Sequence, residues 1–245
     1  MRVLELFSGT QSVGKVLKEK GHSVLSLDLV GADINCNILE WDYKKYNPNE
    51  FDYIHASPPC DTFSHCRKCN FGKPLKAHNP DWNIPNEEKI PFSKELFEQD
   101  QERIGVPILD KTLEIIEYFN PKYFTIENPQ TGDMKKYLNH LKHNDITYCK
   151  YGFDYRKITR VWHNLDKWDP KPICSLKDLC DKVIMVEIED KEHFHHLSSC
   201  ANKIKTNQNL KHIKNMGTIK GGGNSKKDRY RIPPLLVKEW VECMN

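Results

Sequence analysis

The chain has 245 residues, of which 38% are hydrophobic and 29% are charged, and its formal net charge is only +3. This length can bury a sizeable core and is common for a single α/β unit, so we expect one catalytic domain with a small insertion. No apolar run is long enough to cross a bilayer, no basic-then-apolar leader is present, and nine cysteines form no even disulfide framework. We therefore expect an intracellular protein without disulfides.

Alternating strand and helix patterns run through the first half of the chain. Apolar runs and helical periodicity predict strands at 2–7, 23–28, 51–56 and 122–127, and helices from about Ser12 to Lys20 and from about Leu96 to Phe119. This alternation predicts a parallel sheet with helices on both faces.

Two later stretches break the alternation. Residues 64–95 carry several prolines and polar side chains and predict a long loop, which in a compact domain is usually a functional lid or disordered. Residues 163–228 have weak periodicity, and the run Gly221-Gly222-Gly223-Asn224-Ser225 indicates a flexible hinge. We interpret residues 163–228 as a small recognition region.

The first predicted strand ends in small residues, in the run Phe7-Ser8-Gly9-Thr10-Gln11-Ser12. A strand, a tight turn and a helix N-terminus form a nucleotide-sized site, because small side chains allow the backbone to approach a ligand closely. Asp28 ends the second strand, where an acid suits the hydroxyls of a ribose. An ordinary turn explains the Phe-x-Gly pattern equally well when it is taken alone.

Cys60 follows a third apolar strand in the run Ala56-Ser57-Pro58-Pro59-Cys60. The two prolines stiffen the chain and place the thiol on a rigid edge, as a nucleophile requires. A single cysteine near a strand end is more often inert packing, so this interpretation depends on the neighbouring motifs.

Two further segments carry charge at strand ends. The run Tyr123-Phe124-Thr125-Ile126-Glu127-Asn128-Pro129 brings a carboxylate to the C-terminal end of a strand, which is the usual ligand edge of a parallel sheet. Residues 151–162 interleave cations, including Arg156 and Arg160, with a strand-like pattern.

In this order the four segments resemble the cytosine carbon-5 DNA methyltransferase family, through its Phe-x-Gly, Pro-Pro-Cys, Glu-Asn and arginine motifs. The resemblance covers most of residues 1–162 and resumes at Arg229-Tyr230-Arg231-Ile232-Pro233-Pro234, as in compact phage and viral members. It implies a Rossmann-like sheet that uses S-adenosylmethionine, with a catalytic and cofactor-binding domain at 1–162, a target-recognition region at 163–228 and a C-terminal segment at 229–245 that packs back on the catalytic domain.

The resemblance also implies roles for individual residues. Cys60 adds to carbon 6 of cytosine, and Glu127, fixed by Asn128, shares a proton with ring nitrogen 3. Arg156 and Arg160 bind the base carbonyl, a phosphate or Glu127. The loop after Cys60 closes on a cytosine flipped out of duplex DNA. The implied S-adenosylmethionine site comprises Phe7, Ser8, Gly9, Thr10, Ser12, Asp28, Asn37, Ile38 and Pro58.

Three departures from the family pattern keep alternatives open. Gln11 stands where many relatives carry glycine, Asn37 where an aspartate often binds adenine, and the spacing around Tyr155 differs from the common Gln-x-Arg-x-Arg form. A catalytically weak relative that binds nucleic acid, and an RNA cytosine methyltransferase like the branch that acts on transfer RNA, are therefore the alternatives to a monomeric DNA enzyme.

Local charge points to phosphate contacts in two places. Residues 65–78 contain four Lys or Arg and no acid, and residues 201–231 contain nine Lys or Arg with Asp228 as the only acid. A solvated surface is the simpler explanation of either run alone, but beside a methyltransferase motif we expect DNA binding. The expected contacts are Ser64, Arg67, Lys68, Lys73, Lys76, Lys226 and Lys227.

Several cysteines and histidines could also bind a metal. Cys66 and Cys69 have chelating spacing but no evident second pair, so free thiols are the favoured interpretation. The recognition region contains possible zinc ligands at irregular spacing, and we predict no metal there while retaining four candidates: Cys174, Cys180, His196 and Cys200.

Overall fold

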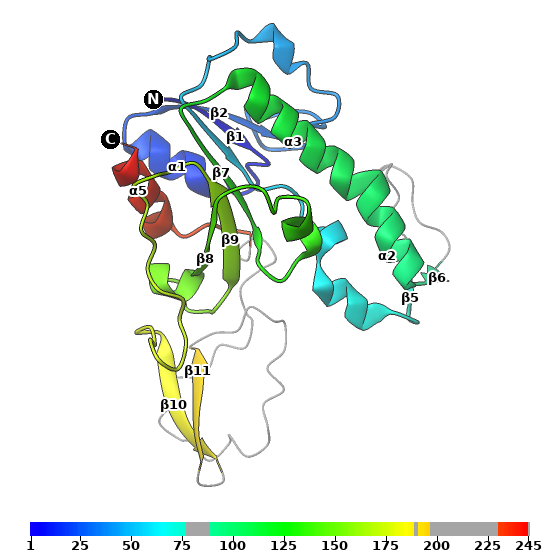
Figure 1. Cartoon of the computed structure of the whole chain (residues 1–245), viewed down its shortest axis with the longest axis vertical. Coiled ribbons are helices and arrows are strands. Elements are labelled where there is room, and N and C mark those ends of the chain that lie inside the picture. The colour runs from blue at the N-terminus through cyan, green and yellow to red at the C-terminus, as the bar shows by residue number, and fades with distance from the viewer. Residues whose placement is uncertain (77–88, 189–190, 197–229, 245) are drawn as a thin grey trace.

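A seven-stranded sheet forms the centre of the molecule (Figure 1), in the order β3-β2-β1-β4-β7-β9-β8. The computed structural model describes residues 1–76, 89–188, 191–196 and 230–244. The strands of this sheet are β1 (Arg2–Leu6), β2 (Ser23–Asp28), β3 (Ile34–Asn35), β4 (Tyr53–Ala56), β7 (Tyr123–Pro129), β8 (His143–Thr147) and β9 (Ile158–His163). The four strands predicted from the apolar runs are thus present: β2 has the predicted bounds, and the other three have shifted ends.

The four predicted strands are parallel, as expected, but the whole sheet is mixed because it gains an antiparallel strand at one edge. Strands β3, β2, β1, β4 and β7 run parallel, whereas β9 is antiparallel to both β7 and β8. The connection between β8 and β9 contains only the short 3-10 helix η6 (Tyr148–Tyr151). A parallel crossover needs a longer connection, which is why these two strands pair antiparallel.

The helices begin and end at recognisable signals. They are α1 (Ser12–Glu19), α2 (Lys94–Asp100), α3 (Val106–Phe119) and α5 (Pro234–Cys243). The Ser93 side chain caps α2 by accepting the N–H of Leu96 at 3.1 Å, and α3 ends where Asn120 takes a left-handed conformation before Pro121. The helix predicted from Leu96 to Phe119 is therefore present, but it begins at Lys94 and contains a π-helical turn, η4 (Gln101–Gly105).

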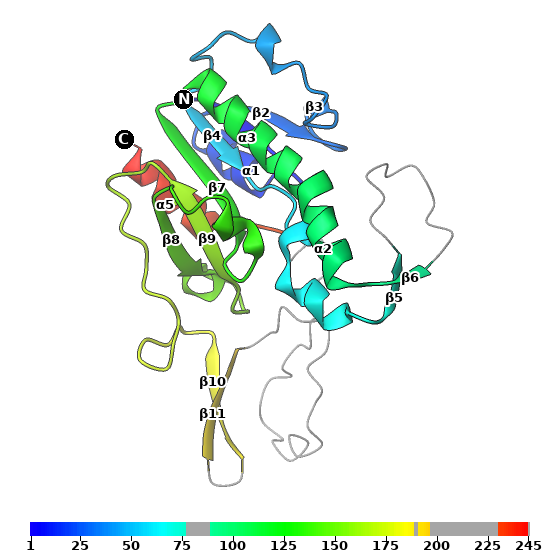
Figure 2. The ribbon, with the colours of Figure 1, turned by 45° about the vertical axis from the view of Figure 1, so that its right-hand side comes forward.

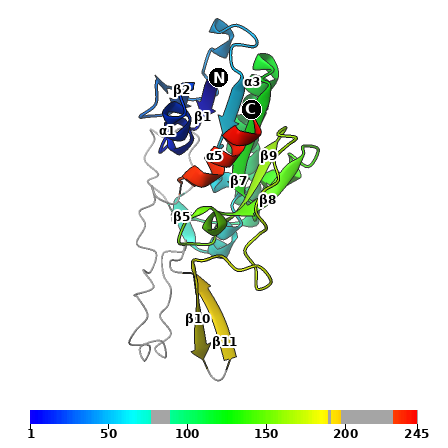
Figure 3. The same ribbon diagram turned by 90° about the vertical axis from the view of Figure 1, so that its left-hand side faces the viewer.

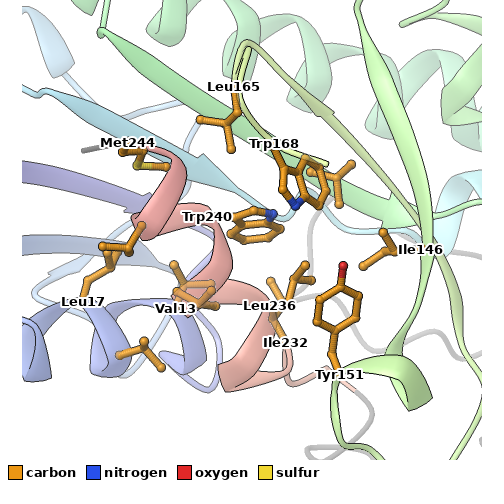
Figure 4. Close-up of a cluster of buried hydrophobic side chains, with 14 of the residues drawn as sticks. Val13, Leu17, Ile146, Tyr151, Leu165, Trp168, Ile232, Leu236, Trp240 and Met244 are labelled. Carbon is orange, nitrogen blue, oxygen red and sulfur yellow. The ribbon is translucent and has the colours of Figure 1, made fainter. Parts of the chain in front are cut away.

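Side chains alternate between the two faces of the sheet and build a core on each face. Leu4 and Ile54 pack with α3 on one face, whereas Val3 and Tyr53 pack with α1 and α5 on the other. Figures 2 and 3 show these helices on opposite faces, as the sequence predicted. In the second core, Trp240 of α5 lies between α1 and Trp168 (Figure 4). The C-terminal segment therefore packs beside the N-terminal helix.

Two small hairpins complete the described structure. One is β5 (Pro74–Lys76) with β6 (Lys89–Pro91), and the other is β10 (Val183–Ile188) with β11 (Lys191–His196). The long loop predicted at 64–95 thus contains the 3-10 helix η3 (His65–Asn70), this first hairpin and the start of α2. The β10–β11 hairpin extends away from the main sheet (Figure 3).

Some predictions fall outside the described residues. They are the hinge at Gly221–Ser225, the expected phosphate contacts Lys226 and Lys227, and the candidate ligand Cys200. In the part of the chain that the structure describes, no helix combines the length and the apolar character needed to span a membrane.

Candidate active site

A cavity of about 580 Å³ opens at the carboxyl ends of the parallel strands. This edge is where ligands bind in open α/β sheets. Cys60, Glu127 and Asn128 line it, together with every residue that the sequence assigned to the cofactor: Phe7, Ser8, Gly9, Thr10, Ser12, Asp28, Asn37, Ile38 and Pro58. One space therefore joins the expected cofactor residues to the expected nucleophile.

The loop between β1 and α1 has the backbone of a tight ligand-binding turn. Phe7, Gly9 and Gln11 have φ values of 58°, 47° and 53°, all in the left-handed region. The Gly9 N–H donates to Asp28 Oδ2 at 2.7 Å, which fixes the loop against the end of β2. The hydroxyl oxygens of Ser8 and Thr10 are buried without a hydrogen-bond partner in the structure. Buried polar atoms without partners favour a polar ligand in this loop.

A buried carboxyl group lies beneath this loop. Burial raises the pKa of Glu5 to about 7, and hydrogen bonds from the backbone N–H groups of Gly14 and Val13 partly offset that rise. A Cβ atom on Gly14 would lie 2.4 Å from Glu5 Oε2, so any larger residue there would displace the Glu5 carboxyl group from its position against the first turn of α1. Glu5 also lines the cavity, where it adds an acidic group.

Cys60 is half-buried and follows β4 through the Pro58-Pro59 segment. The Asn128 side-chain amide donates to the Pro58 carbonyl at 2.8 Å and so ties the nucleophile segment to the end of β7. Burial, followed by the negative charges of Asp61 and Glu127, raises the pKa of Cys60 to about 11, although Lys157 acts in the opposite direction. Cys60 is therefore a protonated thiol at neutral pH in this state of the protein.

Glu127 is buried at the end of β7 and has two partners that sequence reasoning missed. The Tyr148 hydroxyl donates to Glu127 Oε1 at 2.8 Å, and Lys157 Nζ lies 3.4 Å from the same oxygen. Lys157 lines the cavity, and its ammonium group also lies over the Tyr148 ring. The sequence signal for Lys157 was its position in the cationic segment 151–162. Arg156 and Arg160 in the same segment resembled the family's arginine motif more closely, so they were predicted instead.

The two arginines predicted to be catalytic point elsewhere. Arg160 donates two hydrogen bonds to Asp145, at 2.6 and 2.8 Å, and so joins β9 to β8. The Arg156 Nε group donates to the Cys174 carbonyl at 3.0 Å. Neither arginine is among the described residues that line the cavity, so Lys157 is the cation that the structure places beside Glu127.

The segment after Cys60 is held by ion pairs within the protein. Arg67 contacts Asp100 at 2.5 Å, and His65 and Lys68 contact Asp133 at 2.7 and 3.2 Å. Burial alone would raise the pKa of Asp133, but these hydrogen bonds, with others from Lys136 and Gln101, lower it well below its ordinary value. These contacts fix η3 against α2 and the short helix η5 (Asp133–Lys136).

The remaining expected DNA contacts lie along the same segment. The Ser64 carbonyl accepts the N–H of Arg67, and the Lys73 ammonium donates to the Cys69 carbonyl at 2.9 Å. Lys76 lies in β5. Arg67 is 13% exposed and already paired with Asp100, so Lys68 and Lys73 are more accessible than Arg67.

A polar network supports the floor of the cavity. The His55 ring bonds to Thr125 Oγ1 at 2.8 Å through Nδ1 and to Ser57 Oγ at 3.0 Å through Nε2, and Tyr53 reaches the same Thr125 oxygen at 2.6 Å. Burial lowers the pKa of His55 to about 4, so its ring is neutral at physiological pH. The network joins β4 to β7 directly below the segment that carries Cys60.

Three of the four metal candidates lie together at a second place. Cys174, Cys180 and His196 gather around Cys149, a residue the sequence did not single out. Cys66 and Cys69 are exposed on η3. None of the four clustered residues lines the cavity, so the two groups are separate parts of the described structure.

A Gly-containing turn before a helix, an acid at the end of β2, and a cysteine and a glutamate at neighbouring strand ends define a ligand-binding α/β enzyme site. A protein of Frog virus 3 (isolate Goorha), described as "Probable DNA (cytosine-5)-methyltransferase", is 34% identical to the chain over 249 residues, covering 99% of both sequences. The chain therefore belongs to the DNA (cytosine-5)-methyltransferase family, and the resemblance expected from its motifs is confirmed.

The comparisons with family models and with solved structures give weaker matches than this relative. No protein-family model matches the chain. Among solved structures, a variant of Spodoptera frugiperda DNMT2 is 19% identical with a TM-score of 0.40, and it matches 73% of this chain and 56% of its own. The Entamoeba histolytica methyltransferase EhMeth is 14% identical with a TM-score of 0.41, matching 76% of this chain and 58% of its own. The chain spans little more than half the length of these solved proteins.

Proposed function

We propose that the chain is a DNA (cytosine-5-)-methyltransferase that transfers a methyl group from S-adenosylmethionine to carbon 5 of cytosine through a covalent bond to Cys60. The observation that carries this proposal is the single cavity in which the β1–α1 loop, Cys60 and Glu127 meet. Membership of the family supports the reaction, and the cavity supports this chain's ability to perform it.

The residues around the β1–α1 loop fit S-adenosylmethionine. Asp28 offers a carboxylate for the ribose hydroxyls, the unpartnered hydroxyls of Ser8 and Thr10 offer polar contacts, and Ile38 adds an apolar wall. Asn37 also lines the cavity, but its side-chain oxygen accepts the N–H of Leu39 at 3.1 Å and shapes its own loop. When it is bound, S-adenosylmethionine supplies an electrophilic methyl group on a sulfonium centre.

Cys60 provides the nucleophile. Carbon 5 of cytosine needs activation before it can take a methyl group, so the Cys60 thiolate adds to carbon 6 and moves the electron pair of the 5,6 double bond toward carbon 5. After carbon 5 has been methylated, a base removes its remaining proton, and the carbon–sulfur bond breaks to release the Cys60 thiolate. Because the Cys60 pKa is raised in the free protein, the thiol must lose its proton as the substrate binds.

Glu127 balances the charge that this addition creates. A proton shared between Glu127 and ring nitrogen 3 neutralises the negative charge that develops on the ring. Tyr148 and Lys157 both contact Glu127 Oε1 and therefore orient the carboxyl group, leaving its other oxygen for the base. We assign to Lys157 the charged role beside Glu127 that the sequence gave to Arg156 and Arg160, which instead support β9 and the Cys174 segment.

The substrate we propose is duplex DNA with its target cytosine flipped into the cavity, bound by a monomer. Extrusion of the base costs a few kcal/mol, roughly, and the described part of the segment after Cys60 lies beside the cavity to close on it. We propose phosphate contacts from Lys68, Lys73 and Lys76, and target recognition by residues 163–228. A DNA substrate places the enzyme in the cytoplasm or nucleus of a host cell.

The direct test is transfer of labelled methyl from S-adenosylmethionine to mixed-sequence duplex DNA and, in parallel, to RNA, followed by mass spectrometry of the nucleosides. We expect 5-methyldeoxycytidine from DNA and no labelled product from RNA. Label that appears only in RNA would assign the chain to RNA methylation. Binding of S-adenosylmethionine without product on either polymer would identify a catalytically inactive binding protein.

A further inference from the structure

Three cysteines and one histidine from distant parts of the sequence meet outside the cavity. Cys149 lies in η6, Cys174 and Cys180 flank a tight turn in the segment after β9, and His196 ends β11. Their ligand atoms all lie within 4.8 Å of one another. The group thus joins the catalytic sheet, the intervening segment and the β10–β11 hairpin at one point.

The spacing suits a tetrahedral metal site. A zinc–sulfur bond of about 2.3 Å places tetrahedral ligands about 3.8 Å apart, with nitrogen slightly closer than sulfur. Cys174 Sγ and His196 Nε2 are already 3.5 Å apart, and shifts of about 1 Å or less bring the remaining pairs within that range. Three thiolates and one imidazole are a common closed ligand set for structural zinc.

Surrounding hydrogen bonds hold the ligands in place. The Cys174 N–H donates to Thr147 Oγ1 at 3.0 Å, and its carbonyl accepts from Arg156. Between the two cysteines, Ser175 and Asp178 pair through their backbones, and Lys150 contacts Asp178 at 2.6 Å and the Leu179 carbonyl at 3.2 Å. Ordered supports of this kind accompany metal sites because they fix the first ligands in position.

The cysteine cluster lies where the hairpin meets the catalytic sheet. In the described structure the three cysteines form a small buried cluster of their own, and the apolar neighbour packed against it is Val183 of β10. An isolated two-stranded hairpin is marginally stable in water, and small regions without a large core often use a metal. A disulfide would involve only two of these cysteines, whereas one metal ion uses all four groups.

We propose that Cys149, Cys174, Cys180 and His196 bind one structural zinc ion that fastens the β10–β11 hairpin to the catalytic sheet. All four positions are protein ligands, so the ion has no open position for catalysis. If the function proposed above is correct, the same ion also orients the recognition region on DNA, and its removal weakens DNA binding while S-adenosylmethionine binding persists. The metal site itself does not depend on that function.

Metal content is the first measurement, made on the full chain purified under reducing conditions. We expect one zinc ion per chain by elemental analysis and by native mass spectrometry. Replacement with cobalt should give the intense visible absorption of a tetrahedral cobalt–thiolate centre, a result that needs no variant. The absence of bound metal after incubation with excess zinc, or a stoichiometric iron content instead of zinc, would overturn the proposal.

Variants then locate the ligands. Cys149→Ser and Cys180→Ser should lose the zinc, the matched Cys66→Ser and Cys69→Ser changes on exposed thiols should keep it, and Cys200→Ser should keep it as well. His196→Cys should retain one ion with an altered cobalt spectrum, which distinguishes a ligand from a residue needed only for folding. Full zinc content in a Cys149→Ser and Cys180→Ser double variant would contradict the assignment. Because these readouts are independent of methyl transfer, they stand even if the enzyme proves inactive.

Discussion

The catalytic cavity and the β10–β11 hairpin fix their functional side chains in different ways. The cavity lies at the ends of strands whose two faces are covered by large apolar cores, so backbone position alone brings Cys60 and Glu127 together. The hairpin extends beyond that sheet, and three cysteines form the buried cluster at its base. Side-chain positions in the cavity therefore depend on the packed sheet, whereas we infer that the junction with the hairpin depends on the cysteine cluster and the ion proposed for it.

The largest expected effect in the cavity comes from Cys60→Ala. We expect methyl transfer to fall by at least about a thousandfold, because no other group can form the bond to carbon 6. S-adenosylmethionine binding, measured by calorimetry, should be unchanged since the β1–α1 loop is intact. Cys66→Ala removes an exposed thiol on η3 and should retain activity. Substantial turnover by Cys60→Ala would contradict a mechanism in which Cys60 bonds to the base.

The next largest effect is expected from Glu127→Gln, which keeps the size of the side chain but removes its acid–base function. The rate of methyl transfer should fall by roughly a hundredfold to ten-thousandfold. Glu117, which is exposed on α3 and does not line the cavity, offers a control, and Glu117→Gln should leave the rate unchanged. Single-turnover kinetics with the enzyme in excess over DNA would measure both, and equal rates for the two variants would show that Glu127 is not part of the chemistry.

Acid should destabilise the catalytic sheet through two buried histidines. Burial lowers the pKa of both His55 and His163 from 6.5 to about 4, so between these values the unfolded chain binds more protons than the folded one. The contribution of each neutral ring to the unfolding free energy is therefore fully present above about pH 6.5 and is lost as the pH decreases to about 4, by about 3 kcal/mol for each ring. The raised pKa of Glu5 contributes with the opposite sign between about pH 7 and pH 4.5.

Urea unfolding at several pH values would measure this loss. His55→Gln should flatten the dependence of the unfolding free energy on pH, and the exposed His143→Gln should not. The same slope in wild type and His55→Gln would mean that His55 is not the group that takes up the proton.

A smaller effect on kcat should distinguish Lys157, which lines the cavity, from Lys150, which lies beside the cysteine cluster. Lys157→Met removes the ammonium group beside Glu127 and should lower kcat by roughly tenfold to a hundredfold, the value of a hydrogen bond to a charged group. Lys150→Met removes the contact to Asp178 beside the cysteine cluster and should leave kcat close to wild type while loosening the hairpin. Proteolysis of the hairpin and steady-state kinetics together would show the two effects, and a larger loss of kcat in Lys150→Met would contradict this division.

Many residues that line the cavity could be grouped from the sequence because they belong to short local motifs. A strand followed by Phe7-Ser8-Gly9, or by Pro58-Pro59-Cys60, places its side chains at one edge whenever the strands run parallel, and periodicity shows the strands. Lys157 was missed because the antiparallel pairing of β9, which no local pattern revealed, decides which cation of the segment reaches Glu127. Arg160 instead donates hydrogen bonds to Asp145 of β8, a strand that was not predicted from the sequence.

The cysteine cluster could not be assembled from the sequence for a related reason. Cys149 is separated from Cys174 and His196 by β9 and by an irregular segment, so no ligand spacing of a known zinc motif connects them. β11 runs antiparallel to β10 and ends near η6, which places His196 beside Cys149. Contacts between irregular segments produce no recognisable pattern in the sequence. Motifs at strand ends do, because they follow an apolar run directly.

Covalent trapping on DNA in which 5-fluorocytosine replaces cytosine would show directly whether Cys60 bonds to the base. Fluorine at carbon 5 cannot leave as a cation, so elimination is blocked and the enzyme remains bound to the base through sulfur. We predict a stable complex that forms only with S-adenosylmethionine present, and peptide mapping that places the base on Cys60. Methylation of ordinary DNA without any trapped complex, or a base attached to another cysteine, would contradict the account.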